Sequence, residues 1–178
     1  MSTELNKQSS CSQAGECAKQ TNKAPSRGFV AISWLAVAVW AVVIFFMSSR
    51  TGGQLNSEMG FVSWIIAEIK SFCVSVASGN TELTFQIGHF CEYGIFGALL
   101  CNAFRLHMPF KKALVCAILC ASLYGVSDEI HQYFVPSRSC DPVDWMIDTI
   151  GATCGAGVFL LLARLLNAHQ AKKRSTGV

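Results

Sequence analysis

The chain has 178 residues, enough for one domain, and 52% of them are hydrophobic while only 14% are charged. Together with a mean hydropathy of +0.40, this composition favours helices surrounded by lipid. The net charge of +3 does not indicate a nucleic-acid-binding protein, because the basic residues are not gathered in one patch interleaved with aromatics.

The first part of the chain changes abruptly from polar to apolar. Residues 1–27 are polar and lack apolar periodicity, which predicts a disordered tail. Gly28–Met47 is a run of 20 uncharged residues, long enough to span a bilayer. Its end at Ile44–Met47 does not fit a signal-peptide cleavage site, so we expect an uncleaved first transmembrane helix.

Ser57–Ser78 predicts a different kind of helix. Its apolar residues recur at helical spacing on one face, but Glu58, Glu68 and Lys70 interrupt the run. We therefore expect an amphipathic helix in the outer membrane interface. A simple packing element or lid is an equally good interpretation.

Three more apolar segments predict spans two, three and four, at Phe85–Phe104, Ala113–Phe134 and Trp145–Leu166. Only 14 residues separate Lys112 from Ser127, which is too few for a membrane crossing. The third helix must therefore carry its acidic and histidine residues in its last turns. The prediction is an all-α membrane domain over residues 28–168, followed by a basic cytoplasmic tail over residues 169–178.

The basic residues give an independent prediction of topology. Eleven of the 14 fall in the two terminal segments and in the connection between spans two and three. By the positive-inside rule, both termini are expected in the cytoplasm, with four transmembrane helices between them. The basic residues on the predicted cytoplasmic side are Lys7, Lys19, Lys23, Arg27, Arg105, Lys111, Lys112, Arg164, Lys172, Lys173 and Arg174.

Three ionisable residues are expected at one depth in the membrane. His89, Asp128 and Asp148 each lie 16 residues from a basic residue at the inner end of their helix. A rise of about 1.5 Å per residue places all three ~24 Å from that end. In a hydrocarbon core roughly 30 Å thick, they would form one polar layer near the outer face. Ionisable groups at such positions are usually functional.

Further polar residues share helix faces with these three. On the second helix Gln86, Glu92 and Tyr93 lie on the face of His89, and on the third His131 and Gln132 lie on the face of Asp128. On the fourth helix Asp144 precedes Asp148 by one turn. Gly151 and Gly155 continue that spacing, and we interpret these glycines, together with Ala152 and Gly157, as helix-packing positions.

Three segments resemble motifs of the VanZ-like family of membrane proteins. The most characteristic runs from Tyr124 to Arg138 and contains Asp-Glu-Ile-His-Gln followed by Pro-Ser-Arg. Gly88–Gly94 resembles the first motif of that family, and Asp144–Gly151 resembles the third. The resemblance implies a multi-pass membrane protein of a family named for an accessory protein of teicoplanin resistance. Ser137 and Asp148 depart from the usual glycine and asparagine of these motifs.

The first functional hypothesis is a site for a polar lipid headgroup or a cell-envelope intermediate at the outer leaflet, with a link to glycopeptide resistance implied by the family alone. If the site is catalytic, hydrolysis or group transfer is the expected reaction, although no serine or cysteine stands out as a nucleophile. The planar guanidinium of Arg138 would suit a phosphate or carboxylate. The candidate catalytic residues are His89, Glu92, Asp128, Glu129 and His131, and the candidate ligand-binding residues are Tyr93, Gln132, Arg138, Asp144 and Asp148.

Two alternatives remain open from the sequence. His89 with Glu92, and Asp128 with His131, would suit manganese, iron or zinc in a helical bundle, although the sequence does not decide on any cofactor. Alternatively the layer is a self-satisfying network in a structural or accessory protein, in which His89 bonds Glu92 and Arg138 neutralises Asp144 or Asp148.

The nine cysteines do not indicate a zinc site, because no Cys-x-x-Cys spacing occurs. Five of them lie in apolar runs, where a thiol behaves as a small hydrophobic group. Cys73 and Cys140 are the two expected on the outer side, and whether they pair is left open.

Overall fold

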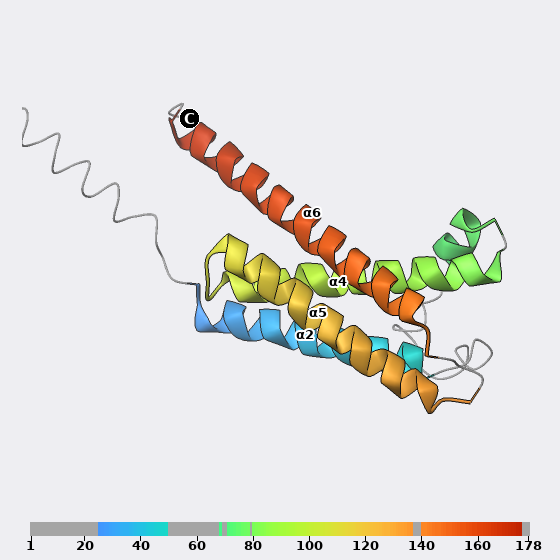
Figure 1. Ribbon diagram of the computed structural model, residues 1–178. Helices are drawn as coiled ribbons and strands as arrows, with labels where there is room; N and C mark the ends of the chain where they lie inside the picture. Colours follow the sequence, from blue (N-terminus) through green and yellow to red (C-terminus); the bar gives the residue numbers. More distant parts are fainter. Residues whose placement is uncertain (1–24, 50–67, 69–70, 79, 137–139, 176–178) are drawn as a thin grey trace, which may run out of the picture.

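The computed structural model describes residues 25–49, 68, 71–78, 80–136 and 140–175, and within these ranges every regular element is a helix. The long helices are α2 (Arg27–Ser48), α4 (Thr81–Arg105), α5 (Phe110–Tyr133) and α6 (Pro142–Ser175). They run alternately up and down, so that the start of α2 lies at the same end of the bundle as the α4–α5 connection (Figure 1).

Helix α4 is the centre of the bundle, because it makes the most extensive contacts with the other three helices. Helix α6 crosses α4 at a marked angle, and its last turns run away from the other helices (Figure 1). The predicted spans therefore correspond to the observed helices. Helix α6 extends past the boundary expected at residue 168, as its last turns contain Ala, Gln, Lys and Arg, which are good helix formers.

The helix ends follow from local sequence. The Ser26 hydroxyl accepts a hydrogen bond from Phe29 N at 3.2 Å and caps α2. The Asn80 side chain does the same for Leu83 N at the start of α4. Helix α5 begins after Pro109 without a side-chain cap, because proline sets a favourable backbone angle at a helix start.

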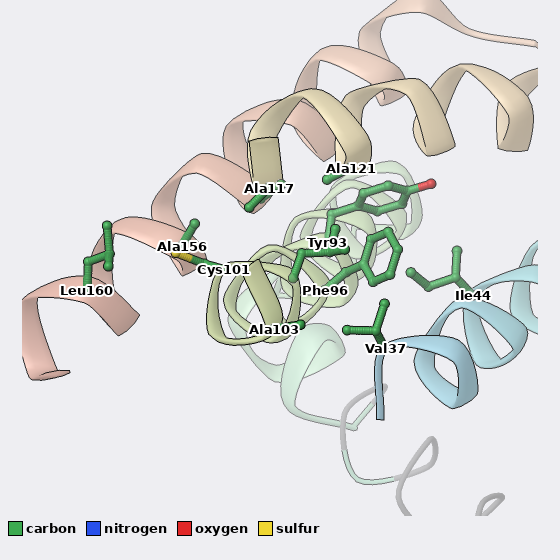
Figure 2. Packing of buried hydrophobic residues seen from close by; sticks show 12 residues of the cluster. Val37, Ile44, Tyr93, Phe96, Cys101, Ala103, Ala117, Ala121, Ala156 and Leu160 are labelled. Carbon is green, nitrogen blue, oxygen red and sulfur yellow. The ribbon is translucent and has the colours of Figure 1, made fainter. Parts of the chain in front are cut away.

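The bundle is packed through small residues. Six alanines from α4, α5 and α6 are completely buried, and Tyr93 and Phe96 fill the space between them and α2 (Figure 2). Large apolar side chains instead cover the outside; Leu123, for example, is 70% exposed. This pattern is typical of helices in lipid, where apolar side chains gain nothing by facing inward and small residues permit close contact. The buried alanines are Ala103, Ala113, Ala117, Ala121, Ala152 and Ala156.

Helices α2, α5 and the Pro142–Gln170 part of α6 are long and apolar enough to cross a membrane. Helix α4 is 25 residues long but is not among these three, because His89 and Glu92 interrupt its apolar stretch. Its central position in the bundle explains that composition, because much of its surface faces other helices rather than lipid.

Three predictions fall wholly or mainly outside the described residues. These are the disordered tail over residues 1–27, of which only 25–27 are described, the interfacial helix over Ser57–Ser78, and Arg138. Of the interfacial segment, only residue 68 and residues 71–78 are described, and 71–76 are helical. Cys73 is buried and Cys140 is exposed, and both are free thiols.

Candidate functional site

The site contains an ion pair between two helices. Nδ1 of His89 on α4 lies 3.0 Å from Oδ1 of Asp148 on α6, and Asp148 is completely buried. The sequence suggested a bond between His89 and Glu92 on the same helix, whereas the Nδ1 atom of His89 bonds Asp148 on another helix. The reason is that α6 approaches α4 closely enough for Asp148 to reach the histidine first.

Small residues produce that close approach. A Cβ atom added at Gly151 would lie 2.5 Å from the carbonyl oxygen of Phe90, the residue that follows His89. Added Cβ atoms at Gly97 and Gly155 would collide with the backbones of Ala152 and Gly94. The prediction of packing positions is therefore confirmed for Gly151, Ala152 and Gly155, and the same contact places Asp148 against His89. It is wrong for Gly157, where an added Cβ atom would meet nothing within 4 Å because that side of α6 is open.

The third member of the predicted layer lies beside this pair. Asp128 on α5 is buried, and its Oδ2 accepts a hydrogen bond from Gln132 Nε2 at 3.1 Å. Gly125, one turn before Asp128, leaves room for Asp148, since a Cβ atom there would lie 3.4 Å from Asp148 Oδ2. Asp128 is within electrostatic range of both His89 and Asp148. His89, Asp128 and Asp148 thus meet in one layer.

His131 faces another part of the bundle. Its Nε2 lies 2.9 Å from the hydroxyl of Ser49, just past the end of α2, and its ring packs on Phe45 with centroids 4.5 Å apart. Because the Ser49 hydroxyl donates its single hydrogen to the carbonyl of Phe45 at 2.7 Å, it accepts a hydrogen bond from His131. The expectation that His131 shares one binding face with Asp128 and Gln132 is therefore only partly met: the latter two bond each other, while His131 joins α5 to α2.

Glu129 closes the turn between α5 and α6. Its Oε2 accepts a hydrogen bond from the backbone N–H of Asp141 at 2.8 Å. Asp144, in the first turn of α6, is half-buried and lies within electrostatic range of Glu129 and His89. The backbone carbonyl of Glu92 accepts a hydrogen bond from Trp40 Nε1 at 3.0 Å, which joins α4 to α2.

Four buried polar atoms in this region lack a hydrogen-bond partner among the described residues, and each comes from a different helix. They are the Ser48 hydroxyl on α2, the Tyr93 hydroxyl on α4, Glu129 Oε1 on α5 and Asp148 Oδ2 on α6. Tyr93 is completely buried, and its hydroxyl points away from Ala156 and Leu160 at the apolar end of the cluster (Figure 2). Buried polar atoms are nearly always bonded to protein or to water, so these four atoms have a capacity for further hydrogen bonds.

These atoms belong to one neighbourhood. The Ser48 hydroxyl lies next to the Asp128 carboxylate, although it does not meet hydrogen-bond geometry. Tyr93 interacts electrostatically with Asp128 and Asp148, and Glu129 interacts with His89 and Asp148. Ser48 and Ser49 were not identified as site residues from the sequence. The signal that could have found them is a pair of hydroxyls at the C-terminal end of a mostly apolar helix.

The metal hypothesis finds no support in the geometry of the described part of the chain. Within residues 25–49, 68, 71–78, 80–136 and 140–175, no three side chains of His, Cys, Asp or Glu are placed to hold one metal ion. The two pairs proposed as ligands point to different partners, because His89 bonds Asp148 and His131 bonds Ser49.

The comparison with protein families identifies the chain. The model of the VanZ/LLP1 family matches residues 33–163, which include α4, α5 and most of α2 and α6. The chain belongs to the VanZ/LLP1 family. The resemblance noted in three sequence motifs is thereby confirmed, and all described residues of the polar layer lie within the matched part of this family member. No curated protein and no solved structure matches the chain significantly.

Proposed function

We propose that this VanZ/LLP1 family protein binds the polar group of a cell-envelope lipid or lipid-linked intermediate, in a site at the extracytoplasmic ends of its helices. In this proposal α4 also crosses the membrane, which makes four transmembrane helices in total, and both termini lie in the cytoplasm. The positive-inside distribution of basic residues and the alternating helix directions support that topology (Figure 1).

The observation that carries the proposal is the set of four unpartnered buried atoms. A structural network would satisfy its own members, because an unbonded buried polar group costs about 1–3 kcal/mol. Here Ser48, Tyr93, Glu129 and Asp148 each leave one atom unsatisfied within the described part of the chain. A bound polar group, with any water that accompanies it, would supply their missing partners.

The His89–Asp148 pair gives the site a capacity for proton transfer. A carboxylate on Nδ1 fixes the tautomer of the imidazole and leaves Nε2 to bind or exchange a proton with a ligand. This is the arrangement that general acid–base catalysis uses, so it would serve hydrolysis or group transfer on the bound molecule. Glu129, Gln132 and Asp128 would hold the ligand, and Arg138 would add a cationic contact.

Native mass spectrometry of the full-length protein, extracted gently from its membrane, tests the proposal. We expect a lipid adduct on the wild type that is lost in Asp148→Asn and in Ser48→Ala. Glu82→Gln is the matched control, because Glu82 is an exposed carboxylate in the first turn of α4. An adduct profile that is identical in all four proteins would refute a binding role for the layer.

The second candidate is a structural or accessory role. The hydrogen bonds of His131 to Ser49 and of Glu129 to the backbone of Asp141 favour it, because they join separate parts of the bundle. The two roles differ in their effect on protein abundance. If the layer is a binding site, Arg138→Ala and His131→Ala should abolish an envelope phenotype and leave the amount of protein in the membrane unchanged. A matching loss of abundance in both variants would favour the structural role.

A further inference from the structure

A second set of polar contacts lies at the other end of the bundle, where α4 ends at Arg105. The Arg105 side chain is half-buried, and its Nε donates a hydrogen bond to Oδ1 of Asn102 at 3.1 Å. Asn102 Nδ2 in turn donates to the Ser33 hydroxyl on α2 at 3.2 Å, and that hydroxyl donates to the carbonyl oxygen of Phe29 at 2.9 Å. This series of bonds joins α4 to α2 and holds one edge of the guanidinium in place.

An aromatic ring fixes the face of the same guanidinium. Its central carbon lies over the ring of Phe159 on α6, 5.1 Å from the ring centroid. The guanidinium carbon of Arg164, also on α6, lies 5.8 Å from the ring centroid of Phe110, the first residue of α5. Arg105 is the last residue of α4, so both arginines stack on rings from other helices at the connection between α4 and α5.

The described part of this end of the bundle is positively charged. Lys111 and Lys112 follow at the start of α5, and both are exposed. The nearest described carboxylate along α4 is that of Glu92, 13 residues before Arg105, which corresponds to about 20 Å of helix. A half-buried guanidinium without a described carboxylate beside it is suited to an anion from another molecule. The other described Asp and Glu residues lie toward the opposite ends of their helices or beyond them, at positions 68, 82, 128, 129, 141, 144 and 148.

The remaining donors of Arg105 define the chemistry that it can bind. Asn102 occupies Nε, which leaves the N–H groups of the two terminal nitrogens, Nη1 and Nη2. Such a planar fork binds a phosphate through two hydrogen bonds, and it loses little freedom when its plane is already held. Leu161 and Leu165, on either side of Arg164, are 58% and 57% exposed. Apolar surface beside cations suits acyl chains beside a headgroup, so a lipid phosphate fits better than a soluble one.

We propose that Arg105 binds the phosphate of an anionic phospholipid at the cytoplasmic end of the bundle, with additional positive charge from Arg164. Nη1 and Nη2 of Arg105 donate to two phosphate oxygens, and the acyl chains lie against the exposed leucines of α6. The choice of leaflet rests on the topology proposed above. The site is separate from the polar layer around His89 and Asp148 and does not depend on the function of that layer.

Phosphatidylglycerol and phosphatidylcholine are the decisive probes, because both carry a phosphodiester but only phosphatidylglycerol has a net negative charge. The binding of each lipid to delipidated full-length protein is measured by native mass spectrometry. The wild type should bind phosphatidylglycerol more tightly than phosphatidylcholine by a factor of about ten. Equal binding of the two lipids, as expected where a carboxylate of the chain itself neutralises Arg105, would overturn the inference.

Three variants locate the preference. Arg105→Gln should reduce it to less than about threefold, because the fork and its charge are lost together. Arg164→Gln changes an exposed residue, so the variant should fold normally, and it should lower the preference to a smaller extent. Arg27→Gln is the matched control, because Arg27 is exposed at the start of α2, at the same end of the bundle, and should retain the full preference (Figure 1). Full preference in both the Arg105 and Arg164 variants would refute the site, and an equal loss in Arg105→Gln and Arg27→Gln would show a diffuse attraction instead.

Two further comparisons separate this site from its alternatives. Inorganic phosphate at millimolar concentration should fail to displace phosphatidylglycerol, and displacement would assign the arginines to a soluble phosphate and overturn the lipid assignment. A lipid that is lost in Arg105→Gln and kept in Asp148→Asn occupies the arginine site. A lipid that is lost in Asp148→Asn and kept in Arg105→Gln would refute this inference and leave the proposed function of the polar layer intact.

Discussion

His89 Nδ1 and Asp148 Oδ1 lie 3.0 Å apart across the contact between α4 and α6, at the point where the apolar packing of the bundle ends. One turn further along each helix lie Tyr93 and Ala152, both completely buried. The pair is therefore a polar contact beside a stretch of the helix interface that is made largely of small and apolar residues.

Removal of either member of this pair should destabilise the protein strongly. His89→Leu and Asp148→Leu each leave one buried ionisable group without its partner, at an expected cost of about 3–5 kcal/mol. The double variant should cost less than the sum, because no group is left unpaired, with a coupling free energy of about 0.5–3 kcal/mol. Unfolding of purified protein in mixed micelles measures all three values. Strict additivity would show that the two side chains do not stabilise each other.

The glycine contact predicts different effects for the same substitution at neighbouring positions. Gly155→Ala places a methyl group against the backbone of Gly94, and we expect a loss of about 1–3 kcal/mol from overpacking. Gly157→Ala meets nothing within 4 Å and should be neutral or stabilising by up to about 1 kcal/mol, because alanine favours the helix. Thermal unfolding in detergent compares the two. Equal effects would contradict the close approach of α4 and α6.

The hydrogen bond from Tyr124 to α2 gives a third prediction. Its hydroxyl donates to the carbonyl oxygen of Ala41 at 2.7 Å and joins α5 to α2. Tyr124→Phe should lower the free energy of unfolding by about 1 kcal/mol. Tyr133→Phe is the matched control, because Tyr133 is exposed at the end of α5 and should change stability little. If Tyr124→Phe is as stable as this control, the bond contributes nothing.

The topology predicts which thiols react from outside the cell. Cys140 is exposed between α5 and α6, so it should react with a membrane-impermeant maleimide in intact cells when the other cysteines are replaced. A cysteine introduced by His107→Cys, between α4 and α5, should react only after permeabilisation. Gel-shift analysis of the labelled protein distinguishes the two positions. Labelling of both in intact cells would reject cytoplasmic termini and four spans.

Much of the fold could be predicted from local sequence. An isolated run such as Gly28–Met47 forms a helix because a backbone in lipid must satisfy its own hydrogen bonds, and length and composition are enough to identify it. The proximity of His89, Asp128 and Asp148 could be predicted for a similar reason: helical rise is constant, so equal spacing from the ends of their helices brings them to one level. Helix α4 was harder to identify as a membrane helix, since its polar residues are compatible with a membrane only where other helices cover them.

The pairing of side chains depended on the tertiary structure. Helical spacing correctly placed Gln132 near Asp128, one turn away on the same helix, but it could not show that His131 would turn to Ser49 on α2. Nor could it show that Asp148 would bond His89, because that bond depends on how closely Gly94 and Gly155 allow two helices to approach. The sequence by itself determined the helices and the common level of the three ionisable residues along them, because these depend on local spacing and on the apolar character of each segment. Only the tertiary structure decided which polar atoms in that layer meet and which four are left without a partner, because the rotation and separation of packed helices are properties of the whole bundle.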